Sequence, residues 1–392
     1  PRMTAHLPEH SELTVVGGGP VGATVALLAA QAGRQVTLLE ARPSGSGRRD
    51  DPRVLALSHT SQQALLAAGA WPDSLPATPI DTVHISQQGS FGRTLIQRDD
   101  LQLPHLGYTV GYHDLNVALD QALAQSSVQR VDAATVTGLT SLSAYARVQF
   151  QHDGQRHALT TRLVALAEGG ALAAGLPGMR RHEHDYQQSA VIARVETALP
   201  HQGMAFERFA TDGPLALLPY GNALMLVWTR DSATAESLKT LDDTAFCTAL
   251  QGAIGDRLGA ITAVSPRATV PLKLKFALNT VSGRVALVGN AAQTMHPVAA
   301  QGLNLGLRDA LGLVQCLGED GDVGDARKLA EFARLRRTDR RSVTGFTHSL
   351  IQLFDRHDPV INTVRGLSLS LLDSIGPLRR AFAGHLVFGV GV

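Results

Sequence analysis

A glycine-rich turn near the N-terminus is the feature that most constrains the fold of this 392-residue chain. Residues 13–16 form a short apolar run typical of a buried strand, and residues 23–31 have the pattern of an apolar helix. A second apolar run at 35–39 ends at an acidic residue, Glu40. Between the first run and the helix lies a Gly-x-Gly-x-x-Gly pattern made by Gly17, Gly19 and Gly22. This order of elements predicts a βαβ unit that binds a dinucleotide.

The glycines and the acidic residue have separate physical roles in such a unit. Glycine permits a tight turn, lets the backbone approach a pyrophosphate and allows close packing of helix on strand. The N-terminus of the helix adds N–H groups that favour an anion. We expect the Glu40 carboxylate to accept hydrogen bonds from the ribose of an adenosine group. The pattern alone does not distinguish NAD from FAD.

A second strand, turn and helix pattern occupies residues 284–309. An apolar strand breaks at Gly289-Asn290, and after a loop a helix is expected to begin near Gln301. The helix is indicated by Leu303, Leu307 and Leu311, which recur at a spacing of four residues. A helix that starts here would direct backbone N–H groups at a bound anion or a polarised ring. On its own, the pattern is equally compatible with an ordinary crossover between a strand and a helix.

Composition and charge exclude several classes of protein. A net charge of +1 gives no electrostatic case for binding nucleic acid. Cys247 and Cys316 form no CxxC and no ligand spacing, so we expect no metal and a non-oxidising compartment. The first residues show no signal peptide, and no apolar run reaches about 18 residues, the length of a transmembrane helix. A cytoplasmic location is therefore expected.

The segment GNAAQTMHPVAAQGLNLGLRDA, residues 289–310, resembles the second flavin-binding motif of the single-component aromatic hydroxylases, specifically their ubiquinone-biosynthesis branch. Two further segments resemble the same family: Arg53 with Ala56 and Leu57, and the AFERF and GPLALLP sequences at 205–219. The resemblance implies that FAD, rather than NAD, occupies the glycine-rich turn. It implies cofactor contacts from Gly17, Gly19, Gly22, Glu40, Arg53, Glu168, Gly289, Asn290, Gly302, Leu303 and Asn304.

This sequence departs from the wider family at two of those positions. Glu168 follows a buried strand where the family usually has Asp, in a motif linked to flavin and nicotinamide binding. Asn290 also replaces a usual Asp, which keeps the hydrogen-bonding capacity but removes the charge. Without the resemblance, Arg53 would be interpreted as a solvated loop charge.

The resemblance implies an aromatic-ring monooxygenase that uses FAD, with NAD(P)H as a transient reductant, and O2. The expected substrate is a polyprenylated phenol of ubiquinone biosynthesis. Arg53, His296 and Pro297 are the candidate catalytic residues, although a lone loop histidine is more often structural. Two alternatives stay open: a sister hydroxylase that acts at another ring carbon, and a non-catalytic flavoprotein subunit of a quinone-synthesis complex.

The predicted fold is α/β, with a Rossmann-like FAD-binding domain, an antiparallel-sheet substrate domain and a helical C-terminus. The FAD-binding domain is expected at 11–75, 107–175 and 280–342, the substrate domain at 76–106 and 176–279, and the C-terminal helical segment at 343–392. That last segment clusters apolar residues beside Arg379-Arg380. It is expected either to pack on the domain or to contact the inner membrane peripherally, or other ubiquinone-biosynthesis proteins.

Overall fold

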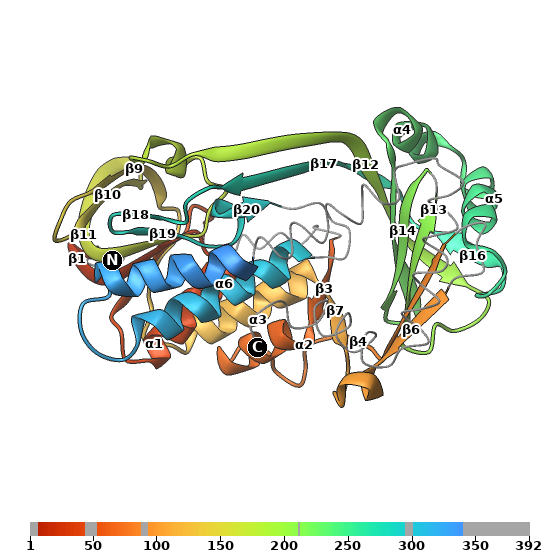
Figure 1. The fold of residues 1–392 in the computed structure, drawn as a ribbon, viewed down its shortest axis with the longest axis horizontal. Coiled ribbons are helices and arrows are strands. Elements are labelled where there is room, and N and C mark those ends of the chain that lie inside the picture. Colours follow the sequence, from red (N-terminus) through yellow and green to blue (C-terminus); the bar gives the residue numbers. More distant parts are fainter. Residues whose placement is uncertain (1–6, 44–52, 88–92, 211, 295–300, 340–392) are drawn as a thin grey trace.

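The structure is a computed structural model, and it describes residues 7–43, 53–87, 93–210, 212–294 and 301–339. Two lobes are joined by two long neighbouring strands (Figure 1). One lobe holds the N-terminal βαβ unit, and the other is a sheet covered by two helices on its outer side. The architecture is therefore the predicted α/β fold with a second, antiparallel sheet.

The first lobe is built on an eight-stranded sheet. Its path runs through β18 (Val281–Ser282), β19 (Val285–Leu287), β11 (Gln155–Leu166), β1 (His10–Val16), β2 (Val36–Leu39) and β8 (Gln129–Val131). Strands β19, β11, β1, β2 and β8 are parallel, and β9 (Thr135–Ser141) and β10 (Ala146–His152) continue from β11 as an antiparallel pair. The central parts of the parallel strands, residues 13–16, 36–39, 163–166 and 285–287, are fully buried and mostly apolar because both faces of the sheet are covered there.

Three helices pack on one face of the parallel strands (Figure 1). They are α1 (Pro20–Gln31), α3 (Tyr112–Ala124) and α6 (Gln301–Leu317). A further helix, α2 (His59–Ala67), and a helix at 326–339 complete this layer. Helix α3 begins at Tyr112, and the polar residues His113 and Asp114 of its first turn are partly buried.

The second lobe is a nine-stranded sheet. Its path runs through β20 (Gln293–Thr294), β17 (Ala268–Ala277), β12 (Arg181–Thr197), β15 (Ala223–Asp231), β14 (Gly213–Tyr220), β13 (Met204–Ala210), β5 (Thr82–Gln87) and β6 (Arg93–Gln97), with β16 (Ile261–Val264) beside β12. Helices α4 (Ser232–Thr240) and α5 (Asp243–Ile254) bury apolar side chains against its outer face. The opposite face is turned toward the first lobe (Figure 1).

Strand β12 begins at Arg181, eight residues before its buried segment at 189–191. Its first half is mostly exposed and polar, so it carries no alternating apolar signal. This half is held by its backbone ladder with β17, from Arg181 paired with Ala277 to Asp185 paired with Lys273. The polar extension is what carries the chain from one lobe to the other.

A small sheet of three strands connects the lobes at a second place. It consists of β3 (Val54–Ser58), β7 (Gly107–Gly111) and β4 (Thr78–Ile80). The Thr109 hydroxyl of β7 donates to the carbonyl of Pro219 in β14, and Gly221 N–H donates to the Thr78 hydroxyl at 2.8 Å. The small sheet therefore fixes one end of β14 relative to the first lobe. The residue boundaries assigned to the two domains from sequence stay a prediction.

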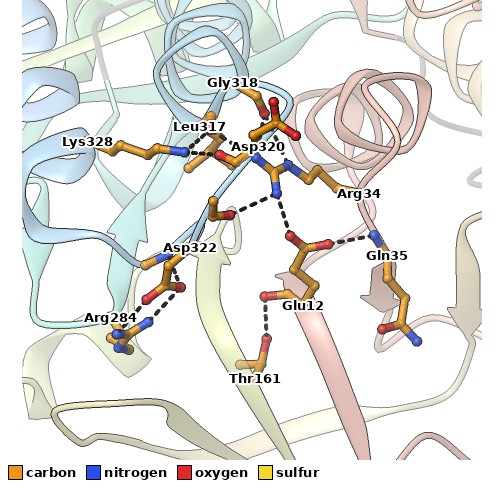
Figure 2. Close-up of polar contacts among 12 residues, drawn as sticks. Glu12, Arg34, Gln35, Thr161, Arg284, Leu317, Gly318, Asp320, Asp322 and Lys328 are labelled. Carbon is orange, nitrogen blue, oxygen red and sulfur yellow. Dashed lines mark hydrogen bonds and ion pairs between the residues drawn. The ribbon is translucent and has the colours of Figure 1, made fainter.

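The C-terminal end of α6 is anchored by two cations (Figure 2). Arg34 donates to the carbonyls of Leu317 and Gly318 at 3.2 and 2.8 Å, and its other side pairs with Glu12 at 2.7 Å. Lys328 Nζ donates to the Leu317 carbonyl at 2.5 Å. Cations at a helix C-terminus satisfy carbonyls that have no partner within the helix. These contacts fix the C-terminal end of α6 relative to β1 and to the helix at 326–339.

Within the described residues, no helix has both the length and the apolar content needed to cross a bilayer. The C-terminal segment expected at 343–392 lies outside the described residues.

Candidate active site

The glycine-rich turn has the tight geometry that its sequence predicts. Gly17 has a φ of +99°, a conformation that favours glycine. A methyl group at Gly22 would lie 1.9 Å from the Gly17 carbonyl oxygen, so only glycine fits there. A methyl group at Gly19, the residue that caps α1, would meet no atom within 4 Å. The backbone is thus packed closely behind the turn and open in front of the helix N-terminus, which suits a pyrophosphate.

Glu40 lies behind this turn and is 5% exposed. Its Oε2 accepts the N–H of Gly18 at 2.6 Å, and its Oε1 accepts Arg42 N and Nε at 2.8 and 3.0 Å. Burial alone would raise the pKa of Glu40, but the hydrogen bonds from Arg42 and Gly18 together hold that pKa below its ordinary value. The carboxylate is therefore kept ionised beside the turn, as an acceptor for ribose hydroxyls must be.

The second motif meets the first at Val21. Gly289 has a φ of +56°, and a methyl group there would lie 3.1 Å from three carbon atoms of the Val21 side chain. A methyl group at Gly306 of α6 would lie 2.7 Å from Val21 Cγ2 and 3.1 Å from Gly289 Cα. Glycine at both positions lets α6 and the turn at 289 approach α1 closely. The two predicted cofactor motifs are thereby brought to one site.

The turn at Gly289 is held from beneath by Asp309 of α6. Asp309 is 1% exposed; its Oδ2 accepts Gly289 N–H at 3.0 Å and Gln293 Nε2 at 2.7 Å. Its Oδ1 accepts Arg336 Nε at 2.6 Å, and Arg336 also pairs with Asp339 at 2.6 Å. Burial by itself lowers the pKa of Arg336, but the two carboxylates raise it overall. A buried ion-pair network therefore ties the turn to the helix at 326–339.

The N-terminal end of α6 is fixed by the Asn304 side chain, which is 5% exposed. Its Oδ1 accepts Ser58 N at 2.8 Å and Ser61 Oγ at 2.6 Å, and its Nδ2 donates to the Ala56 carbonyl at 3.0 Å. The amide therefore joins α6 to β3 and α2. The cofactor contact of Asn304 stays a prediction, and the bonds described here show only that its amide ties α6 to β3 and α2.

Arg53 immediately precedes β3, and its guanidinium carbon lies 4.2 Å from the centre of the Tyr112 ring. The Arg53 carbonyl also accepts the N–H of Tyr112 at 2.9 Å. Arg53 is exposed, and its contact with the face of the Tyr112 ring orients the guanidinium group. Its contact with a flavin stays a prediction.

Glu168 lies next to the glycine-rich turn, since its backbone N would be 3.1 Å from a methyl group at Gly17. Its carboxylate accepts the N–H groups of Gly170 and Leu172 at 2.8 and 3.4 Å, so it caps its own loop. Arg181 then bridges that loop to the second motif, donating to the carbonyls of Gly170 at 2.8 Å and Asn290 at 3.5 Å. The side chain of Asn290 is exposed.

The predicted residues that the structure describes gather at the N-termini of α1 and α6 and the turn at 289. Gly302 and Leu303 lie in the first turn of α6 and are partly buried, next to Asn304. His296 and Pro297 lie outside the described residues. The open space before Gly19, the ionised Glu40 and the tight backbone at Gly22 fit the pyrophosphate and ribose of FAD. The roles of the individual residues toward the cofactor stay predictions.

Sequence reasoning missed three contributors to this arrangement. Arg42 follows Glu40 by two residues, and this local spacing could have suggested its pairing with the acid. Arg181 and Arg336 are distant in sequence from the loops they hold, and nothing in the local pattern marked them.

Comparison with known proteins identifies the family. Residues 10–341 match the family described as "FAD binding domain". The chain is 32% identical to the ubiquinone hydroxylase UbiL of Rhodospirillum rubrum, an alignment covering 98% of this chain and 91% of that protein. It is 30% identical to the 3-demethoxyubiquinol 3-hydroxylase of Escherichia coli, covering 94% of this chain and 96% of that protein.

A solved structure has the same fold at lower sequence identity. The p-nitrophenol 4-monooxygenase PnpA of Pseudomonas putida superimposes with a TM-score of 0.77 at 18% identity, covering 98% of this chain and all of that one. Such a likeness establishes the fold, and the family match with the two hydroxylase relatives establishes the cofactor and reaction class. The chain therefore belongs to the FAD-binding aromatic monooxygenases, which use NAD(P)H as reductant, and within them to the ubiquinone hydroxylase family.

Proposed function

We propose that this protein hydroxylates the ring of a polyprenylated phenol in ubiquinone biosynthesis, and that the substrate is 2-octaprenyl-6-methoxyphenol. The observation that supports a ring hydroxylase most directly is the meeting of two cofactor motifs at Val21, beside a second sheet. The sequence resemblance at 205–219 and 289–310 favours the methoxyphenol substrate. FAD, when bound and reduced by NAD(P)H, supplies the activation of O2.

The residues of this chain are proposed to divide the remaining tasks. Gly17–Gly22 and Glu40 hold the adenosine and pyrophosphate, while the first turn of α6 directs N–H groups at the flavin side. N–H groups of a helix N-terminus stabilise negative charge that develops on a neighbouring ring. His296 and Pro297 are retained as candidates beside that ring from the sequence alone.

A second candidate function is hydroxylation at a different ring carbon. It is favoured by the relative from Escherichia coli, whose name specifies a demethoxyubiquinol and position 3. The two candidates differ in the intermediate that accumulates when the protein is missing. Deleting the gene and analysing the extracted quinone intermediates by mass spectrometry distinguishes them. Accumulation of the unhydroxylated methoxyphenol supports the first function, and accumulation of demethoxyubiquinol supports the second.

We further propose peripheral contact with the inner membrane, because a polyprenyl tail keeps the substrate in the bilayer. The segment at 343–392 supplies apolar clusters beside Arg379 and Arg380, which suit an anionic lipid surface. Other proteins of the same pathway are proposed to strengthen this contact.

A further inference from the structure

The inner face of the second sheet carries one conspicuous carboxylate, Glu207 of β13. Side chains alternate between the faces of a strand, so its neighbours in sequence point to the outer side. Phe206 packs with the apolar cluster under α4 and α5, and Arg208 donates to the Ile254 carbonyl of α5 at 3.4 Å. Glu207 therefore points the other way, to the face turned toward the flavin-side lobe.

The side chains that lie next to Glu207 on the neighbouring strands are small or apolar. Glu207 pairs with Ala216 of β14 and with Ile85 of β5, which share its face. Ala205 precedes it by two residues on the same face, and Leu218 lies two residues beyond Ala216. Ala216 and Leu218 are partly exposed, whereas Leu215 and Leu217 on the other face are buried. The inner face around Glu207 is thus accessible and apolar, and the ion pair of Arg194 with Glu196 lies on the same face three strands away, on β12.

Nothing in the described part of the chain neutralises this acid. Glu207 has no hydrogen-bond or ion-pair partner there, and the nearest titratable groups in sequence and register, Arg208 and His84, lie on the outer face. Part of the Glu207 surface stays accessible, yet enough protein surrounds the carboxyl that burial raises its pKa to about 7. A partly enclosed carboxyl that has a raised pKa and no partner among the described residues is suited to exchange a proton with a ligand.

The same face is tied to the cofactor site through a continuous set of contacts. Asn304 of α6 is bonded to β3, β3 pairs with β7, and Thr109 of β7 is bonded to Pro219 at the end of β14. This path fixes the strand next to Glu207 relative to the N-terminus of α6. A flat aromatic ring between the two would have its apolar body against the sheet.

We infer that Glu207 receives the phenolic hydroxyl of the substrate and removes its proton before the ring is hydroxylated. The O–H bond breaks, its electron pair remains on the phenolate oxygen, and the proton forms a new bond to a carboxylate oxygen of Glu207. A phenolate donates electron density to its ring more strongly than a phenol, which favours attack on an electron-poor oxygen atom. The carboxyl returns its proton to solvent when the product leaves. This inference rests on the proposed function and adds a catalytic base to it.

The test compares wild type with Glu207→Gln, which keeps the shape of the side chain but cannot take the proton. Glu196→Gln is the matched control, since Glu196 lies on β12 of the same sheet and its side chain is 55% exposed. The probe is a 2-methoxyphenol that carries one short prenyl group at carbon 6, added to FAD-loaded protein. Ultraviolet difference titrations then give the affinity of the protein for the probe as the pH is varied.

Because the pKa of Glu207 lies below about 10, the value typical of a free phenol such as tyrosine, the resting probe should stay protonated and donate its hydrogen bond to the carboxylate. We therefore expect wild type and Glu196→Gln to bind the probe more tightly as the pH rises through about 7, and this pH dependence should disappear in Glu207→Gln. Hydroxylation should fall by roughly 10²- to 10⁴-fold, the usual contribution of a general base, with flavin content unchanged.

Two results would overturn the inference. One is a wild-type affinity for the probe that does not change between pH 5 and pH 9, which needs no variant to interpret. The other is a Glu207→Gln protein with the same pH-dependent affinity and the same hydroxylation rate as wild type. If wild type shows the pH-dependent affinity but forms no hydroxylated product, the proposed function fails while the binding role of Glu207 stands.

Discussion

Asp309 of α6 accepts the backbone N–H of Gly289 at 3.0 Å, so a buried carboxylate fixes the turn that begins the second cofactor motif. The same carboxylate pairs with the buried Arg336 at 2.6 Å. The Asp309 side chain thus links the turn at Gly289 to the helix at 326–339.

Asp309→Ala should destabilise the protein and loosen the turn. Removing one partner of a buried ion pair leaves an uncompensated charge, which costs about 3–5 kcal/mol. Urea unfolding should show this loss, and the purified variant should retain less FAD. Glu331→Gln is the control, because its pair with Arg334 is exposed and its loss should change stability little. An Asp309→Ala protein as stable and as flavin-loaded as wild type would contradict the structural role of this network.

Substitutions at Gly19 and at Gly22 of the glycine-rich turn should have different effects. A side chain at Gly19 meets open space, so Gly19→Ala should fold normally. Gly19→Glu should also fold, but its charge in the pyrophosphate path should weaken FAD binding by at least roughly 100-fold, about 3 kcal/mol. Flavin titration of the apoprotein measures both variants. Normal flavin affinity in Gly19→Glu would refute the assignment of this loop.

Gly22→Ala should fail for another reason. Its methyl group would lie 1.9 Å from the Gly17 carbonyl oxygen, and backbone cannot move aside as a flexible side chain can. Such overpacking costs typically about 1–3 kcal/mol or more. Thermal unfolding of the apoprotein should therefore detect a loss in Gly22→Ala that is absent in Gly19→Ala. Equal melting temperatures would show that the turn is less tightly packed than described.

Much of this site could be predicted from sequence because its signals are local. The glycine spacing, the acid at the end of the second strand and the start of α6 at Gln301 all depend on neighbouring residues. The partners that hold these parts in place lie far away in the sequence. Arg336 reaches Asp309 across 27 residues, and a salt bridge of that kind leaves no periodic pattern in the chain.

Register explains the other differences between prediction and structure. The polar half of β12 is a strand only because β17 pairs with it, and the face of Glu207 depends on its pairing with β5 and β14. Long-range pairing of this kind is not contained in the propensity of either segment.

Glu40 should make the stability of the apoprotein depend on acid pH. Its folded-state pKa is lowered, so its contribution is present above 4.5, its ordinary pKa, and is lost as the pH falls through the folded value. Glu40→Gln should therefore lower stability at pH 7 and flatten the acid side of the stability curve. Urea midpoints measured from pH 3 to pH 7 test this. A wild-type-like acid profile in the variant would mean that Glu40 is not the linked group.

Arg53→Ala should slow NAD(P)H oxidation in the presence of the phenol. The guanidinium is oriented by Tyr112 beside β3, and losing its contact with the cofactor should cost at least about tenfold, or 1.4 kcal/mol. Arg53→Lys is the control that keeps the charge without the planar fork. Unchanged turnover and unchanged coupling to hydroxylation in Arg53→Ala would mean that Arg53 is only a solvated loop charge.

Membrane contact should depend on the two arginines of the C-terminal segment. Each basic residue near an anionic surface contributes about 1 kcal/mol, so Arg379→Ala/Arg380→Ala should bind roughly 30-fold more weakly. Co-sedimentation with vesicles containing anionic lipid measures this, and added salt should reduce wild-type binding. Identical sedimentation of wild type and a folded, flavin-loaded double variant would exclude this surface.

The most direct test of the proposed reaction follows the oxygen atom. Purified FAD-loaded protein is supplied with NAD(P)H, a short-chain 2-methoxy-6-prenylphenol and O2 labelled with oxygen-18, and the product is analysed by mass spectrometry. We predict one labelled oxygen atom in the ring of each product molecule, formed in step with NAD(P)H consumption. NAD(P)H oxidation without a labelled ring product would contradict the assignment of this protein as a ring hydroxylase of prenylated phenols.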